Sequence, residues 1–534
     1  EVEDLEDYCA DNPEICEAPV LFSASDNPLD FDQNDTLGPD ELELKYARLS
    51  DFHGYNTGFL IEAGSVVVET SLNFGGAAAN DNDFGENGPS GLIDPQFSGI
   101  GFGALLITGE GSTLEAKNFL HFSAQCKNSS QGRCPDDGGN LNPIDSNDYI
   151  DIAGELIVRD GSDQRGMRTF GGKDVFIVRP GAVVDVSKDI DLGGQDDQFI
   201  VGGKVSVVDG LRLGGGNDIF RVTEGGVFES GPDKKGTSNI AFSSGQDTLE
   251  NAGTISTSWG IVFQGGASDD GDQLINLPSG EIQTYAGINF VDSERGTIDN
   301  SGLIEVALEN PDGRQIVFGN GDDRILNRAG GVIDVKGTIN MGDGDDLIIN
   351  NGTLRVTRDI QMRGGDDWFA LSGEGLELQN GSKVDGGEGL DQLVFSDQQF
   401  SSEVPDGVDA SQQSSSGRIL IDADEVVKRF VNFENAIQYK GSYEYQGDFS
   451  SNFERVTIRD GVMVVRDTEP VVFQNLELEQ DGTIVVGLSK SDPSSRSSRS
   501  APITVTSLSK SGGFTYQSGG KLVISADAQD DPQG

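Results

Sequence analysis

The sequence predicts an all-β protein folded as a parallel β-helix (β-solenoid) with loop insertions. The main observation is an acidic, glycine-rich turn followed by a short apolar strand, which recurs roughly every 21 to 29 residues. Such turns begin at Phe170, Leu192, Leu213, Phe318, Met341 and Met362. A repeat of this length is one coil of a solenoid, in which equivalent residues of successive coils stack on one another.

The segments between the turns have the pattern of strands. Apolar and polar residues alternate at 205–208 and 352–357, which predicts one face in the core and one in solvent. Three regions follow from this pattern. Residues 1–145 form an N-terminal cap and irregular coils with two Cys-closed loops, and 146–397 form the regular array. Residues 398–534 form irregular coils with Ser-rich loops and a short helix at 422–430.

An asparagine recurs once per coil in the second half of the array. The positions are Asn251, Asn276, Asn300, Asn327 and Asn350. Stacked amides can hydrogen-bond along the solenoid axis, and Asn also favours turns through bonds to its own backbone. The first interpretation is an amide column and the second is a set of independent turns; both require the same fold.

The net charge of the chain limits the kinds of partner that it can bind. It has 37 Lys and Arg against 90 Asp and Glu, a formal net charge of -53. Like charges repel, so this charge argues against nucleic acid and anionic lipid as direct partners. No apolar run is long enough to span a bilayer, and we expect no membrane insertion. The chain begins Glu-Val-Glu-Asp-Leu without a signal peptide, which we interpret as a mature form.

Four cysteines form two close pairs in the sequence, Cys9 with Cys16 and Cys126 with Cys134. Local pairs without C-x-x-C spacing favour two small disulfide loops over a metal site or free thiols. Disulfides form in oxidising compartments. The pairs therefore predict a secreted or cell-surface protein.

The regular array followed by the Asn-Phe-Glu segment at 432–434 resembles the passenger of a bacterial autotransporter (type V secretion). A second Asn-Phe-Glu stands at 452–454, and the strands at 503–508 and 519–525 resemble late passenger coils. The resemblance covers roughly residues 100 to 528. It implies a right-handed parallel β-helix, exported to the extracellular side or surface of a Gram-negative cell. The membrane barrel of that family is missing from this chain, so we expect either a mature form after removal of signal and barrel or export by another route.

The repeated aspartates are the candidate metal ligands. The segment at 386–394 matches the calcium-binding nonapeptide GGxGxDxUx, and stacking would bring equivalent carboxylates of successive coils together. The predicted calcium ligands are Asp197, Asp218, Asp323, Asp346, Asp367 and Asp391. The alternative is that each Asp binds backbone N–H groups of its own turn and holds no metal. Both interpretations remain open at the level of sequence.

No enzymatic activity is expected. The chain has two histidines, His53 and His121, and no G-x-S-x-G motif, which argues against a Ser-His-Asp hydrolase. Paired aspartates recur in nearly every coil, whereas a catalytic pair should be singular. We therefore predict an extracellular structural protein, either a self-assembling building block of a filament, appendage or surface layer, or an adhesin for a surface glycan or a host or neighbouring cell. The alternative is a glycan-binding or glycan-cleaving β-helix.

Overall fold

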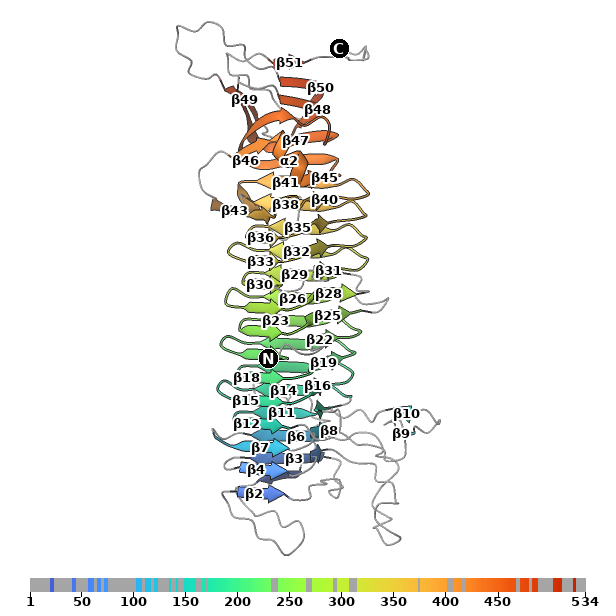
Figure 1. The fold of residues 1–534 in the computed structure, drawn as a ribbon, viewed down its shortest axis with the longest axis vertical. Helices are drawn as coiled ribbons and strands as arrows, with labels where there is room; N and C mark the ends of the chain where they lie inside the picture. The colour runs from blue at the N-terminus through green and yellow to red at the C-terminus, as the bar shows by residue number, and fades with distance from the viewer. Residues whose placement is uncertain are drawn as a thin grey trace, which may run out of the picture. The chain divides into compact units, whose positions relative to one another are not determined.

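The fold was analysed in a computed structural model of the chain (Figure 1). The described backbone comprises 20–23, 41–44, 56–61, 65–68, 72–74, 102–107, 111–116, 120–122, 134–135, 141–142, 148–159, 166–169, 171–231, 239–265, 271–291, 295–306, 315–372, 375–400, 408–413, 419–466, 471–479, 483–487, 503–510 and 522–524. It divides into two compact units, residues 1–289 and 290–534.

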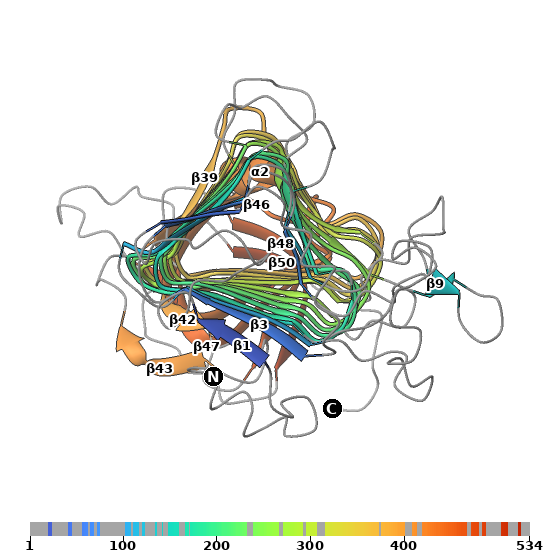
Figure 2. The ribbon, with the colours of Figure 1, turned by 90° about the horizontal axis from the view of Figure 1, so that it is seen from below.

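In the first unit, three parallel sheets form the three sides of each coil (Figure 2). The first sheet contains β1 (Val20–Ser23), β3 (Asn56–Ile61), β6 (Phe102–Ile107), β11 (Tyr149–Ile152), β14 (Val175–Val178), β17 (Gln198–Val201), β20 (Ile219–Val222), β23 (Thr248–Asn251) and β26 (Gln273–Asn276). The second contains β2 (Glu41–Leu44), β4 (Ser65–Val68), β7 (Thr113–Ala116), β12 (Glu155–Val158), β15 (Val183–Val186), β18 (Lys204–Val207), β21 (Val227–Ser230), β24 (Thr254–Thr257) and β27 (Glu281–Thr284). The third contains β5 (Leu72–Phe74), β8 (Leu120–Phe122), β13 (Met167–Arg168), β16 (Asp189–Asp191), β19 (Gly210–Gly214), β22 (Asn239–Phe242), β25 (Gly260–Gln264) and β28 (Gly287–Val291). In a separate two-stranded sheet, β9 (Cys134–Pro135) pairs antiparallel with β10 (Leu141–Asn142).

The second unit repeats this three-sheet coil and then changes. Its first sheet contains β29 (Thr297–Asn300), β32 (Arg324–Asn327), β35 (Leu347–Asn350), β38 (Trp368–Ser372), β41 (Gln392–Ser396) and β46 (Asn435–Asp448). The other two contain β30 (Leu303–Val306), β33 (Val332–Val335), β36 (Thr353–Val356) and β39 (Leu376–Leu378), and β31 (Gln315–Val317), β34 (Thr338–Asn340), β37 (Ile360–Gln361), β40 (Val384–Asp385) and β45 (Phe430–Val431). Later elements are the hairpin β42 (Gln398–Phe400) and β43 (Val408–Gln413), β44 (Ile419–Asp422), α2 (Ala423–Arg429), β47 (Arg455–Arg466), β48 (Val471–Leu478), β49 (Thr483–Gly487), β50 (Ile503–Lys510) and β51 (Leu522–Ile524).

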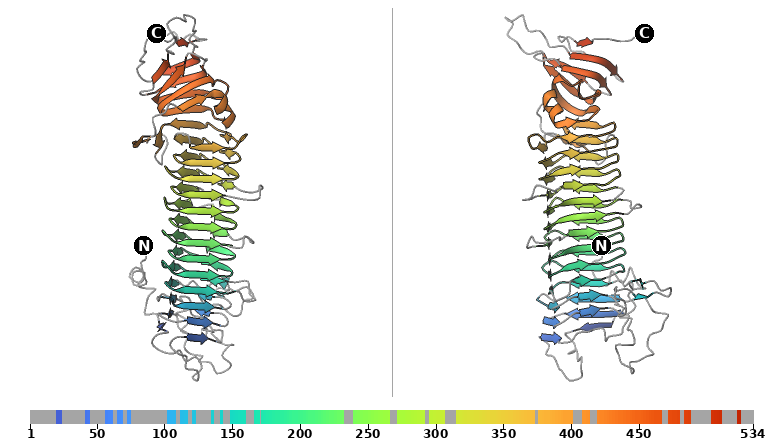
Figure 3. Two further views of the ribbon diagram at one scale, coloured as in Figure 1. Left: turned by 60° about the vertical axis from the view of Figure 1, so that its left-hand side comes forward. Right: turned by 45° about the vertical axis from the view of Figure 1, so that its right-hand side comes forward.

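The predicted all-β parallel β-helix is confirmed, as the stacked strands in Figure 3 show. The predicted alternation is present too, because β18 and β36 bury every second residue. The short helix expected at 422–430 is α2, where the Asp422 carboxylate caps the start by accepting from the backbone N–H of Asp424. Within the described residues, no helix has both the length and the apolarity needed to cross a membrane.

The core is built from like residues stacked on like. In the first unit Phe176 pairs with Phe199 and Phe199 with Phe220 in register, with ring centroids 4.6 Å and 5.5 Å apart. All three rings are fully buried. Each buried aromatic side chain contributes about 1.5–3 kcal/mol of transfer free energy, so the stacked rings stabilise the coil.

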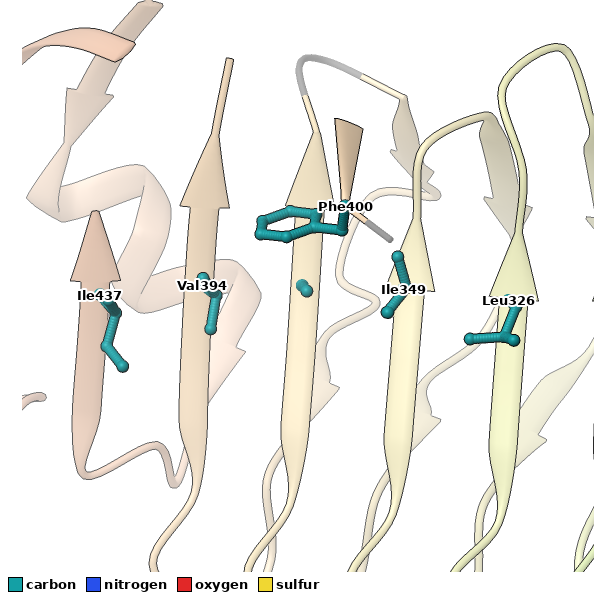
Figure 4. Packing of buried hydrophobic residues seen from close by; sticks show 6 residues of the cluster. Leu326, Ile349, Val394, Phe400 and Ile437 are labelled. Atoms are coloured by element: carbon teal, nitrogen blue, oxygen red, sulfur yellow. The ribbon is translucent and has the colours of Figure 1, made fainter. Parts of the chain in front are cut away.

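In the second unit the outer face of the first sheet is also apolar. Five residues in register, Leu326, Ile349, Ala370, Val394 and Ile437, point away from the core and are buried. Figure 4 shows four of them, Leu326, Ile349, Val394 and Ile437. Phe400, at the end of β42, packs over them and exchanges two backbone hydrogen bonds with the Asn351 side-chain amide. The hairpin strand therefore covers part of a face that the alternation pattern assigned to solvent.

Candidate functional site

The acidic turns that connect the third sheet to the first are held together by glycines. Gly344 and Gly365 both have φ +139, a conformation that side chains rarely adopt. A Cβ on Gly365 would collide with the carbonyl oxygen of Gly344 in the coil before it. The turns thus approach each other so closely that glycine is required, and this places the following aspartates in register.

The last aspartate of the turn belongs to what we call the inner carboxyl column, which includes the six predicted residues, Asp197 and Asp218 in the first unit and Asp323, Asp346, Asp367 and Asp391 in the second. Each of these side chains is at most 1% exposed. The Asp346 Oδ1 accepts a hydrogen bond from the backbone N–H of Asp323 at 2.8 Å, and the Asp367 Oδ1 accepts from the N–H of Asp346 at 2.8 Å. Asp218 accepts from Asp197, and Asp391 from Asp367, in the same way. Each of these bonds therefore links one coil to the next.

Only one oxygen of each inner carboxyl group is used. The Oδ2 atoms of all six residues are buried and have no hydrogen-bond partner. Burial raises the pKa of Asp346 to about 9 and the pKa of Asp367 to about 7, because the charged form is desolvated. Burial likewise raises the pKa of Asp218 and of Asp323 to about 7 and of Asp391 to about 6, and it raises the pKa of Asp197 further. Burial thus shifts each of these carboxyl groups toward its neutral form, by different amounts.

The first aspartate of each turn forms an outer carboxyl row, defined by Asp196, Asp322, Asp345 and Asp366. Asp322 Oδ1 accepts from the backbone N–H of Asp345 at 3.1 Å, and Asp345 Oδ1 accepts from that of Asp366 at 2.8 Å. The acceptor here lies in the earlier coil, so the outer row runs in the opposite direction to the inner column. Asp322, Asp345 and Asp366 are exposed. Each Asp-Asp pair therefore binds the coils on both sides of it.

These contacts correct one detail of the sequence interpretation. The non-metal alternative assumed that each Asp binds N–H groups of its own turn, whereas the donor to the inner column lies one coil away. Stacking distance alone cannot show which N–H a carboxylate will meet. Within the part of the chain that is described, no three His, Cys, Asp or Glu side chains gather at a point suited to a metal ion. Calcium binding stays a prediction.

The asparagine column is confirmed. Asn300 Nδ2 donates to Asn327 Oδ1 at 2.9 Å, and Asn327 Nδ2 donates to Asn350 Oδ1 at 2.7 Å. Asn251 and Asn276 make the same bond in the first unit. The turns are not independent, but the local bond that the alternative assumed is present too, because Asn300 Oδ1 accepts from the N–H of Gly302 two residues on. One buried amide therefore serves its own turn and the next coil.

Sequence reasoning missed four members of the inner column. Asp174, Asp247 and Asp272 in the first unit are buried and accept the same bond from the backbone N–H groups of Asp148, Asp218 and Asp247. The fourth is Glu434, in the second unit. The N–H of Asp391 donates to Glu434 Oε2 at 2.8 Å, so a glutamate occupies the place of the next aspartate. Asn432 has φ +58, which replaces a turn glycine, and Phe433 is buried. The Asn-Phe-Glu segment is thus a modified turn of the same array. Its position one coil after Asp391 was the available signal.

Several candidate residues cannot be placed. Cys9, Cys16 and Cys126 lie outside the described residues, and for Cys134 the description is limited to its backbone in β9. The two predicted disulfides therefore stay predictions. His53 also lies outside the described residues, and His121 is described only as part of the backbone of β8.

Comparison with protein-family models, curated proteins and solved structures gave no match.

Proposed function

We propose that the chain is a secreted or cell-surface structural protein, the passenger of an autotransporter-like system, that works by association rather than by catalysis. The observation that carries this proposal is the use of the repeated polar residues. A side-chain oxygen of Asp346, of Asp345 and of Asn327 each accepts a hydrogen bond from a neighbouring coil. The most regularly repeated polar side chains therefore hold the coils together. A catalytic carboxyl pair is expected once in a protein, whereas these pairs recur in successive coils.

Association would involve self-assembly into a filament, appendage or surface layer. The net charge of -53 opposes contact between copies at low salt, and divalent ions such as calcium would relieve this repulsion. Light scattering of the purified chain under calcium titration tests the proposal. We expect large particles that dissolve when chelator is added. Sodium chloride at matched ionic strength is the control. If it produced the same particles, screening of the charge would explain the assembly without any specific role for calcium.

A steady monomer at high protein concentration with calcium would contradict self-assembly. The adhesin role would then be the form of the proposal that survives, with a surface glycan or a host or neighbouring cell as its partner. Retention of the monomer on whole cells, compared with its heat-unfolded form, would measure that role directly. An absence of binding in both assays would overturn the proposed function.

A glycan-binding or glycan-cleaving β-helix is the second candidate, and one observation favours it. Trp368, Leu347 and Tyr439 are partly buried side chains packed on the apolar outer face of the second unit, and the Arg459 guanidinium lies 5.7 Å from the Tyr439 ring centroid. Aromatic rings beside polar groups suit the apolar face of a sugar. Glycan-array binding should be lost in Trp368→Ala and kept in Trp259→Ala, a 44% exposed tryptophan of the first unit. Equal loss in both variants would contradict this candidate.

A further inference from the structure

One arginine of the second unit stands where the turns before and after it have glycine. Arg363 has φ +80, and the equivalent residues of the neighbouring coils, Gly342 and Gly387, have φ +103 and φ +110. Side chains rarely adopt this conformation, so Arg363 is held in a strained backbone that glycine would adopt freely. Such strain collects at functional sites, which makes the Arg363 side chain a candidate for a role in binding.

The guanidinium group of Arg363 is oriented by two amide side chains on the outer face of the third sheet. Asn340 in β34 and Gln361 in β37 are paired in register, and both are half-buried. Arg363 Nε donates to Asn340 Oδ1, and Arg363 Nη2 donates to Gln361 Oε1 at 3.3 Å. Arg363 is exposed, and within the described ranges no carboxylate forms an ion pair with it. In a chain with 90 acidic residues, this guanidinium group is therefore left available for a ligand.

Arg363, Asn340 and Gln361 form what we call the donor cluster, because only N–H groups remain available at its surface. A guanidinium group has five N–H donors, and Arg363 uses two of them, so three remain. They include the parallel pair on Nη1 and Nη2, a geometry that binds both oxygens of a carboxylate. Because the amide oxygens of Asn340 and Gln361 accept from Arg363, each amide presents its NH2 group outward. Donors without acceptors suit an oxyanion.

The charges around the donor cluster limit which anion fits. Asp385 lies beside the cluster on β40, and its two oxygens accept from Lys383 Nζ at 2.8 Å and from Asn432 Nδ2 at 2.6 Å. This carboxylate is therefore engaged and does not compete for the guanidinium group. Asp343 and Glu388, in the turns on either side of the arginine, are exposed and negative. They repel an anion with several charges much more than they repel a single carboxylate.

We propose that the donor cluster binds the carboxylate of an acidic sugar, such as a uronic acid residue of a surface glycan. The Arg363 fork holds both carboxylate oxygens, and the NH2 groups of Asn340 and Gln361 donate to neighbouring sugar hydroxyls. A uronic acid residue fits because it carries one negative charge among neutral hydroxyls. The inference rests on the adhesin form of the proposed function, to which it adds the chemistry of the partner. The donor cluster lies on the third sheet and is separate from Trp368 on the first.

Isothermal titration calorimetry of the full-length chain with glucuronate, in chelator and at fixed ionic strength, tests the site. Glucose and acetate are the comparison ligands, and we expect glucuronate to bind more tightly than either. Arg363→Gly should weaken glucuronate binding by roughly 10-fold or more, because charge-assisted hydrogen bonds are lost. Arg363→Lys should weaken it similarly, because lysine keeps the charge but lacks the fork. Arg355→Gln removes the same charge from an arginine paired with Glu377 at 2.9 Å, and it should bind as the wild type does.

The glycine variant separates binding from folding. Arg363→Gly restores the residue that the neighbouring turns have, so its melting temperature should stay close to that of the wild type or exceed it. A loss of glucuronate binding in this variant therefore reports on the arginine side chain.

Three calorimetric results would overturn the inference. Acetate that binds as tightly as glucuronate would reduce the cluster to a general anion contact, and glucose that binds as tightly would show that no carboxylate is needed. Glucuronate binding that is unchanged in Arg363→Gly would place the ligand elsewhere. Retention of the wild type on whole cells without glucuronate binding would overturn this site and leave the adhesin role standing. Glucuronate binding that depends on Arg363, without retention on cells, would support the site and count against the adhesin role.

Discussion

Replacement of Asn327 with alanine removes the centre of the amide column in the second unit. The side chain accepts a hydrogen bond from Asn300 at 2.9 Å and donates to Asn350 at 2.7 Å and to the Thr353 carbonyl at 3.0 Å. Asn300 Nδ2 keeps two backbone acceptors, the carbonyls of Gly302 and Val332. The loss therefore falls mainly on the oxygens of Asn350 and Thr353, which lose this donor.

An acceptor left unsatisfied in the interior costs about 1–3 kcal/mol, and the missing atoms leave a small cavity, so we expect Asn327→Ala to lower the free energy of unfolding by about 3–5 kcal/mol. Denaturant unfolding followed by circular dichroism measures this loss. The matched control is Asn320→Ala, an exposed turn residue of the same coil, with an expected change within about 0.5 kcal/mol. Equal effects of the two substitutions would refute the amide column as a source of stability.

Other predictions concern the turns and the end of the array. Gly365→Ala should destabilise the chain by about 3 kcal/mol or more, because it combines an unfavourable φ with a backbone collision. Gly330→Ala is the control and should cost only about 1 kcal/mol, because Gly330 has φ +83 and nothing within 4 Å of an added Cβ. Similar melting temperatures for the two variants would contradict the close packing of turns. Glu434→Asp should cost about 1–2 kcal/mol, because the shorter side chain no longer reaches the N–H of Asp391, while Glu434→Gln keeps the acceptor and should stay near the wild type in the same thermal assay.

The repeat made the structure predictable where equivalent residues of successive coils make the same contact with the neighbouring coil. Asn327 could be assigned to a column because identical residues recur at identical places in the repeat. The direction of the hydrogen bonds to Asp346 could not be predicted. The repeat spacing shows that the aspartates stack, but it does not show which N–H each carboxylate meets. Glu434 differed in residue type from the aspartates it continues, so the pattern did not include it.

The covered outer face of the second unit was wrongly expected to be solvent-exposed. Alternation predicts one polar face, but β35 reads Leu-Ile-Ile-Asn, with Ile349 pointing outward and buried under a distant segment that ends in Phe400. Consecutive apolar residues in β35 and β41 were the available signal. Which segment would cover them depends on the path of the hairpin after β41, and no local pattern encodes that path.

The central claim is that the repeated aspartates hold the coil together as hydrogen-bond acceptors. Unfolding free energies of Asp346→Asn and Asp346→Ala at about pH 7, in the presence of chelator, test it most directly. The account predicts that Asn equals or exceeds the wild type, because it keeps the acceptor for the N–H of Asp323. Ala should lose about 1–3 kcal/mol, because that buried donor is left unpaired. If Asn destabilises the chain as much as Ala does, the negative charge of Asp346 is required, and the acceptor account is contradicted.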